Sequence, residues 1–327
     1  MSRKPAFLKL FKAAQIYSLR ADIPVLSDPE ELSTALNASP FQRCGTQEFS
    51  RSGWKMKETE DGEDTADIIH ENSDILLTVV TETKKIPARA VNEERAILIA
   101  AYVQRTGQQP KAAERHAMRV EAMQKLVTKA FTTTKETQIW IDLSSKLVIV
   151  DTAIPKQAEF ALALLRKSLG SLPVIPVVTT KNVETEVTEW VKKNDYPEKV
   201  WASESLRVAK FEGLFQGSGT VNYRDEDLQT DVTTLLLESG KLISTIGLCV
   251  AGEVDVVLDS NGQLKRIAFP DEVKNPDGEA DDFEQEDDDE AEQDREAMRR
   301  ADFILMCDTL RNAIKRIYDA LGGMAEC

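Results

Sequence analysis

The sequence has little of what metalloenzymes, disulfide-bonded proteins and nucleotide-binding enzymes need. Four cysteines are scattered over 327 residues without a C-x-x-C pair, and only two histidines are present to join them in a metal site. The phosphate-binding pattern G-x-x-x-x-G-K-[ST] and the dinucleotide-binding pattern G-x-G-x-x-G are both absent. We therefore expect free thiols, no catalytic constellation and no cofactor.

Long apolar runs are also absent. No stretch approaches the roughly 20 apolar residues of a membrane-spanning helix, and the charged residues 1–9 are not followed by the apolar segment of a signal peptide. These absences predict a cytoplasmic protein with no membrane partner. A chain of 327 residues is long enough to bury a sizeable core in two or three subdomains.

Charge is concentrated in two segments of opposite sign. The chain has a net charge of −15, yet residues 271–296 alone hold 15 acidic and 2 basic side chains, so the other residues sum to only −2. Residues 84–135 show the opposite bias, with 11 lysines and arginines against 4 glutamates. The acidic overall balance therefore conceals a basic segment suited to phosphate contacts.

The first half of the chain predicts an α+β unit with antiparallel strands. Extended segments are expected over residues 14–20, 47–56, 67–70, 75–81, 139–142, 146–151 and 174–175. A helix is expected over residues 29–36, where Ser27 and Glu30 have the spacing of a capping box. A second helix is expected to begin at Pro155 and to end at Gly170.

A helical hairpin is predicted between these strands. Residues 87–104 and 110–131 are two runs of good helix formers, each with a proline near its start. A short turn that contains Gly107 separates them. The chain is therefore expected to divide into a central α+β domain (residues 1–83 and 132–180), a basic helical hairpin (84–131) and a C-terminal α+β domain (181–327).

The C-terminal part predicts a mixture of helices and an antiparallel meander. Helices are expected over residues 186–193, 227–238 and 309–320, and three strands over residues 241–269 with turns at 251–252 and 260–262. Asp308 is the expected N-cap of the last helix, which follows residues 301–306. Residues 276–294 are acidic and of low complexity, which predicts a disordered loop.

Several short runs are too particular to be generic. The main ones are LLRKSLGSLPV at 164–174, TEWV at 188–191, LKR at 264–266 and ADFILM at 301–306. Shorter matches in the same order include Phe11-Lys12, Cys44-Gly45, Gly53-Trp54, Lys129-Ala130-Phe131 and Leu321-Gly322-Gly323. Through these runs nearly the whole chain closely resembles the bacterial RdgC family of recombination-associated proteins.

The resemblance implies a non-enzymatic, nucleoid-associated protein that binds double-stranded DNA. It also implies a ring-forming homodimer that encircles the duplex and restrains RecA-dependent recombination. Two features depart from the family pattern. Residues 224–226 (Arg-Asp-Glu) stand where family members tend to be basic, and the acidic segment is longer than the resemblance leads us to expect.

The basic segment supplies the candidate DNA-binding residues. Nonspecific duplex binding needs only lysines and arginines spaced to meet phosphates, and Lys111, Arg115 and Arg119 recur at intervals of four. A charged stripe alone is most often a solvated helix face, and it is the resemblance that favours DNA. The candidates are Lys84, Lys85, Arg89, Arg105, Lys111, Arg115, Arg119, Lys125, Lys129, Lys265 and Arg266. Phe131 is a candidate dimer-tip residue, DNA contact or core anchor.

Three alternatives stay open on the sequence. Asp142, Asp151 and Glu159 are carboxylates of the kind that hold Mg²⁺ in nucleases, although no further acidic motif, histidine or lysine completes such a site. The protein could regulate RecA by direct contact and touch DNA only incidentally. The acidic segment could also mimic DNA and fold back on the basic helices.

Overall fold

The computed structural model describes residues 8–58, 62–213, 219–269 and 289–325. Its fold is α+β, as expected. The main element is a 13-stranded sheet in which the strands of the described residues pair in antiparallel fashion. The main path through the sheet runs β12-β11-β13-β14-β15-β1-β8-β7-β6-β2, while β10, β5 and β9 pair with β13, β6 and β1. Strand β1 joins the C-terminal strands to the central strands.

The strands are β1 (Ala13–Leu19), β2 (Ser50–Trp54), β3 (Met56–Glu58), β4 (Asp64–Ala66), β5 (Ile68–Glu71), β6 (Asp74–Lys85), β7 (Phe131–Asp142), β8 (Leu147–Val150), β9 (Val174–Pro176), β10 (Val200–Ala202), β11 (Val208–Gly213), β12 (Thr220–Arg224), β13 (Lys241–Val250), β14 (Val254–Asp259) and β15 (Leu264–Ala268). The helices are the short 3₁₀ helix η1 (Pro24–Ser27), α1 (Pro29–Asn37), α2 (Ala88–Thr106), α3 (Ala112–Val127), α4 (Pro155–Leu169), α5 (Val183–Lys193), α6 (Asp231–Glu238) and α8 (Asp289–Ala320).

Strands β6 and β7 are longer than expected and form a ribbon. They pair residue for residue from Asp74 opposite Asp142 to Lys85 opposite Phe131. The expectation that the second helix of the hairpin reaches residue 131 is therefore wrong, because α3 ends at Val127 and Phe131 begins β7. The physical reason is the run of threonines after Phe131, since β-branched side chains favour the extended conformation.

Proline, glycine and capping residues in the sequence predicted several helix ends correctly, and other ends differ from the prediction. Pro155 begins α4, and Gly170 follows its last residue at φ 76°, as expected. The capping-box assignment is wrong by one residue, because the carboxylate of Asp28 accepts the N–H groups of Glu30 and Glu31 while Ser27 belongs to η1.

Two further helices begin where a side chain caps them. Helix α6 begins at Asp231 rather than at residue 227, because the Thr230 hydroxyl accepts the N–H of Thr233. Helix α5 begins at Val183, three residues earlier than expected, with Asn182 as its N-cap. The three-stranded meander over residues 241–269 is confirmed.

The C-terminal helix is much longer than expected. Residues 289–320 form a single helix, so Asp308 lies inside α8 and is not an N-cap. Residues 289–294, expected to be disordered, are its first turns, and residues 276–288 lie outside the described part of the chain. Good helix formers with acidic side chains near the N-terminus explain this extension.

The sheet separates two buried clusters. Strand β7 shows the alternation, because Trp140 belongs to one cluster and Ile139 and Ile141 to the other. Helix α8 covers the Trp140 face with Phe303, Met306, Cys307, Leu310, Ile314, Ile317 and Tyr318. Helices α1 and α4 cover the opposite face with Leu32, Leu36, Ala158, Ala161, Leu162 and Leu165.

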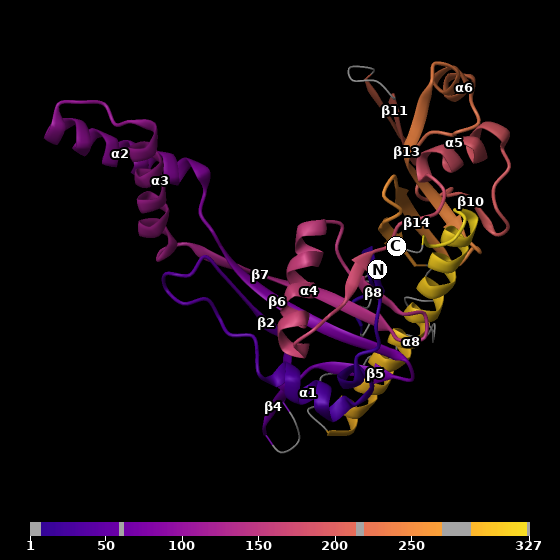
Figure 1. The fold of residues 1–327 in the computed structure, drawn as a ribbon, viewed down its shortest axis with the longest axis horizontal. Coiled ribbons are helices and arrows are strands. Elements are labelled where there is room, and N and C mark those ends of the chain that lie inside the picture. Colours follow the sequence, from indigo (N-terminus) through magenta and orange to yellow (C-terminus); the bar gives the residue numbers. More distant parts are fainter. Residues whose placement is uncertain (1–7, 59–61, 214–218, 270–288, 326–327) are drawn as a thin grey trace.

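The molecule has two limbs that diverge from a central body (Figure 1). The β6–β7 ribbon leads outward on one side and carries α2 and α3, whereas β11, β13, α5 and α6 build the other side. Helix α4 lies between the limbs, and α8 runs from the central body towards the second limb. In the described ranges, no helix has the length and apolar character of a membrane span.

Gly247 in β13 is a sensitive position for stability. A Cβ atom there would lie 1.9 Å from the backbone oxygen of Leu206, so Gly247→Ala has to displace main chain. We expect a loss of about 1–3 kcal/mol in the free energy of unfolding, measured by urea denaturation. Gly45→Ala is the matched control, because its nearest neighbour would lie at 3.5 Å. Equal urea midpoints for the two variants would contradict this prediction.

Candidate nucleic-acid interface

The ribbon and the helical hairpin together form an arm, defined here as residues 74–142. Helices α2 and α3 pack on each other through a small core that includes Val91 and Ala122. At the turn between the helices, the Tyr102 hydroxyl donates to Oε1 of Glu114 at 2.6 Å. This hydrogen bond and one from the backbone N–H of Lys111 lower the pKa of Glu114. The hairpin is therefore fixed by a charged hydrogen bond as well as by packing.

The candidate basic residues of the arm fall into two groups. In the first group, the side chain is used inside the protein. Lys84 donates to the backbone oxygens of residues 45 and 46, Arg89 pairs with Glu93 at 2.9 Å, and Lys125 pairs with Glu94 and Glu121 at 3.4 Å. Arg89 and Lys125 are therefore paired with carboxylates, and Lys84 is held by carbonyl groups, before any ligand arrives.

In the second group, the side chains are exposed and form no ion pair within the described ranges. Its members are Lys85, Arg105, Lys111, Arg115, Arg119 and Lys129. The guanidinium of Arg105 lies 5.8 Å from the ring centre of Tyr102, a cation–π contact that leaves its charge available. These six residues are the members of the predicted DNA-binding set on the arm whose side chains are not engaged by a carboxylate or a carbonyl of the described chain.

Lys265 and Arg266 do not join that set. Both lie on β15, which β1 and β8 separate from β7 in the sheet. Lys265 pairs with Asp259 at 2.7 Å, and Arg266 is exposed at φ 48°. Their part in DNA binding stays a prediction, and it would require a ligand that reaches the central body.

Apolar side chains are exposed beside the basic ones. Phe131 is 89% exposed at the outer end of β7, and Ile97 on α2 is 62% exposed. The core-anchor interpretation of Phe131 is therefore wrong. Helix α2 has apolar residues on more than one side, so packing against α3 leaves Ile97 uncovered. Exposed apolar groups at the end of an extended limb are typical of a contact surface.

Two of the three carboxylates considered for a nuclease, Asp142 and Asp151, have internal partners, whereas Glu159 is exposed. Asp142 accepts from Ser144 Oγ at 2.6 Å and from the backbone N–H of Ser145 at 2.9 Å. Asp151 accepts the backbone N–H groups of Lys12 and Ala13 at 2.8 and 3.1 Å. Over the described ranges, no cluster of three or more His, Cys, Asp and Glu side chains is arranged to hold a metal ion.

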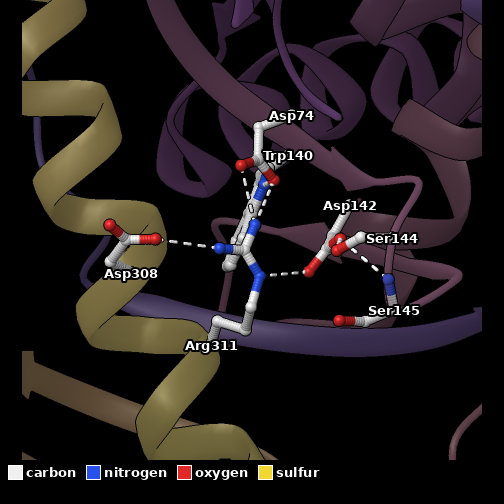
Figure 2. Close-up of polar contacts among 7 residues, drawn as sticks. All are labelled: Asp74, Trp140, Asp142, Ser144, Ser145, Asp308 and Arg311. Carbon is white, nitrogen blue, oxygen red and sulfur yellow. Dashed lines mark hydrogen bonds and ion pairs between the residues drawn. The ribbon is translucent and has the colours of Figure 1, made fainter. Parts of the chain in front are cut away.

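Sequence reasoning missed the residue that anchors the arm. Arg311 on α8 reaches the inner end of the ribbon, where Asp74 and Asp142 lie opposite each other (Figure 2). Its Nε lies 2.8 Å from Asp142, its Nη2 lies 2.5 and 2.7 Å from the two oxygens of Asp74, and its Nη1 lies 2.9 Å from Asp308. The guanidinium also stacks over Trp140, 5.6 Å from the ring centre.

The electrostatics of this cluster are favourable for the ionised forms. Burial alone raises the pKa of Asp142, but hydrogen bonds from Ser144, Arg311 and Ser145 outweigh it and hold the pKa below its usual value. Burial alone lowers the pKa of Arg311, and the hydrogen bonds and charges of Asp74 and Asp142 reverse that effect. Both groups are therefore charged at neutral pH.

Two more ion pairs fasten α8 to the central body. Arg299 binds Asp67 through two nitrogens at 2.8 and 2.7 Å, and Arg300 pairs with Glu71 at 3.2 Å. With Arg311, three arginines of one helix therefore hold the strands around the root of the arm. No motif in the sequence signals these partners, which lie more than 160 residues away along the chain.

Replacing Arg311 by alanine should destabilise the fold strongly. The change leaves two buried or half-buried carboxylates opposite each other, and we expect a loss of about 3 kcal/mol in chemical denaturation. Arg316→Ala is the matched control, because that side chain lies on the same helix and bonds Asn312 alone among the described groups. If the two variants lose equal stability, Arg311 has no special role.

The same cluster predicts a pH dependence of stability. Because the pKa of Asp142 is lowered by folding, its contribution is present above the unfolded value of about 4 and is lost as the pH falls through the folded value. The free energy of unfolding should therefore fall more steeply below pH 4 in the native chain than in Arg311→Ala. Parallel acid profiles would contradict this.

Comparison with known proteins finds relatives that match nearly the whole chain. The family model described as "RdgC: Putative exonuclease, RdgC" matches residues 10–324. A protein of Yersinia enterocolitica named "Recombination-associated protein RdgC" is 31% identical over 319 residues, which cover 97% of this chain and 99% of that protein. A Serratia proteamaculans protein of the same name is 30% identical over 318 residues, with the same coverage. The family description mentions an exonuclease, whereas the relatives are named for recombination. The match to the family model and the identity with these relatives, both over nearly the whole chain, show that this chain belongs to the RdgC family.

Proposed function

We propose that this protein binds double-stranded DNA without sequence preference, closes around it as a ring-shaped homodimer, and restrains RecA-dependent recombination. The observation that carries the proposal is the set of six exposed cations on one extended arm that form no ion pair with the described residues. Residues 84–131 hold ten lysines and arginines against four glutamates, a net charge of +6 in a chain whose total is −15. Such a surface attracts a polyanion even though the net charge of the whole chain is negative.

The arrangement suits phosphates better than bases. The exposed cations lie on α3, at the turn between the helices and at the outer end of the ribbon, so they are spread over a surface and not gathered in a pocket. Phosphate contacts of this kind set the affinity and carry no sequence information. Nonspecific binding to duplex DNA is the simplest activity that uses them.

The two limbs support a ring made of two copies. Exposed Phe131 and Ile97 lie on one limb, and exposed Val232 and Leu235 lie on α6 of the other limb (Figure 1). In the proposed ring, each copy would supply half of the closed outline. In a two-fold symmetric dimer these apolar surfaces would be covered at two contacts. A closed ring would hold DNA by topology as well as by charge.

Occupancy is the mechanism we propose for the effect on recombination. Protein that covers duplex DNA denies RecA access to it, so the inhibition should follow the amount of bound protein per length of DNA. Direct contact with RecA is the competing explanation, and binding to bare duplex without RecA separates the two.

Nuclease activity is a second candidate function, because the family description mentions an exonuclease. Cleavage of DNA with added Mg²⁺ or Mn²⁺ would reveal it.

Binding to a linear duplex of arbitrary sequence should be tight at low salt and steeply salt-dependent. A protein that contacts about six phosphates should show a log–log slope near −5. Changing Lys111, Arg115 and Arg119 together to alanine should reduce that slope by about 3 and weaken binding, as measured by fluorescence anisotropy. The matched control changes Lys192, Lys193 and Lys199, three lysines of the other limb. No binding at low salt would favour the RecA-contact alternative.

Removing the Phe131 side chain should weaken the dimer without unfolding the chain. Its ring is almost fully exposed within one copy, so Phe131→Ala should leave the fold of the single chain unchanged, as measured by circular dichroism. If the arm forms a dimer contact, the dissociation constant from sedimentation equilibrium should rise about tenfold or more. Val178→Ala, a 54% exposed position in another part of the chain, is the control. An unchanged constant would argue against a dimer contact through Phe131.

A further inference from the structure

Helix α4 carries an exposed row that the fold does not use. Lys156, Phe160, Ala163 and Lys167 are spaced at i, i+4, i+7 and i+11, so they line one stripe along the helix. The opposite stripe is buried and packs on the sheet through Ala158, Ala161, Leu162 and Leu165. The row therefore projects away from the protein.

The members of this row are free to meet a ligand. Phe160 is 54% exposed. Within the described ranges, Lys156 and Lys167 form no hydrogen bond or ion pair. A further cation lies near, because Lys135 of β7 donates to Oε1 of Gln157 at 2.7 Å. An aromatic ring between two free lysines is thus displayed on the outer surface of one helix.

The position of α4 makes this row relevant to the proposed ring. The helix lies between the two limbs (Figure 1). In the proposed ring, this is the side that would face the enclosed DNA. DNA held by the arms of a ring would therefore pass in front of α4. The two lysines are about 16 Å apart along the helix axis, at about 1.5 Å per residue, which suits two phosphates of one strand.

The chemistry of Phe160 selects among the forms of DNA. In an intact duplex the faces of the bases are already stacked on one another, so an exposed phenyl ring finds no partner there. An unpaired base offers a free face, and stacking on an aromatic side chain is the usual way in which proteins hold single strands. Lysines on either side would hold the phosphates of the same strand.

We propose that α4 is a binding site for unpaired DNA, in which Phe160 stacks on a base and Lys156 and Lys167 contact phosphates further along the same strand, one on each side of that base. This inference rests on the proposed function, because it places the site inside the DNA-binding ring. It adds that the protein distinguishes single-stranded or gapped DNA from intact duplex at a surface separate from the arm. The arm holds any DNA, and α4 favours strands with exposed bases.

The test compares one single-stranded oligonucleotide with its own duplex. Full-length protein is titrated with each fluorescein-labelled DNA, using the native chain, Phe160→Ala, Phe160→Trp and Ile154→Ala. Ile154 is the matched control, because it is 55% exposed just before α4 and lies outside the row. We expect Phe160→Ala to weaken single-strand binding about fivefold or more and to leave duplex binding within about twofold, with Phe160→Trp close to the native chain.

The outcomes separate this inference from the proposed function. If the native chain binds both DNAs and Phe160→Ala binds each as the native chain does, α4 is not a stacking site and the proposed function stands. Equal losses for single strand and duplex would also overturn stacking. If the native chain binds neither DNA at low salt, both proposals fall. Changing Lys156 and Lys167 together to alanine should weaken binding of the single strand. The loss should be larger than the loss caused by changing Lys192 and Lys193 together to alanine.

Discussion

Two aspartates facing each other across a strand pair set the main constraint on this structure. Asp74 and Asp142 close the inner end of the arm ribbon, and like charges in directly opposite positions repel. Arg311 resolves the conflict by binding both carboxylates while it stacks on Trp140. This one side chain contacts both strands of the ribbon and belongs to α8. It therefore helps to fix the register of β6 on β7, the direction of the arm and the position of α8 on the sheet.

Much of the fold follows from local signals, because those signals act within a few residues. Pro155 and Gly170 set the ends of α4, and turn residues set the meander near the C-terminus. The length of β7 and the continuity of α8 did not follow. Threonines in β7 and helix formers in α8 favour these elements locally, but partners far away in the chain fix their full length. Strand β6 pairs with the whole of β7, and aspartates of the first half anchor α8.

The candidate site shows the same limit. Composition identified the arm as basic, but it did not reveal which cations are used internally. Lys125 faces Glu94 because two helices pack side by side, and Lys84 faces the backbone of a loop about forty residues earlier. Free and engaged lysines look alike in a sequence, so the separation of the arm cations into two groups needed the structure. The exposure of Phe131 also needed it.

The dimensions of the ribbon give the arm the properties of a lever. Twelve paired residues at about 3.4 Å each span about 40 Å, and β2 stiffens this length by pairing with β6 from Val79 to Thr83. A tilt of about 5° at the inner end would therefore carry the outer end through about 3 Å, roughly the length of a hydrogen bond. The arm would pivot about its inner end, where Arg311 binds Asp74 and Asp142. Small changes in how α8 sits on the sheet would thus become large changes in where the hairpin points.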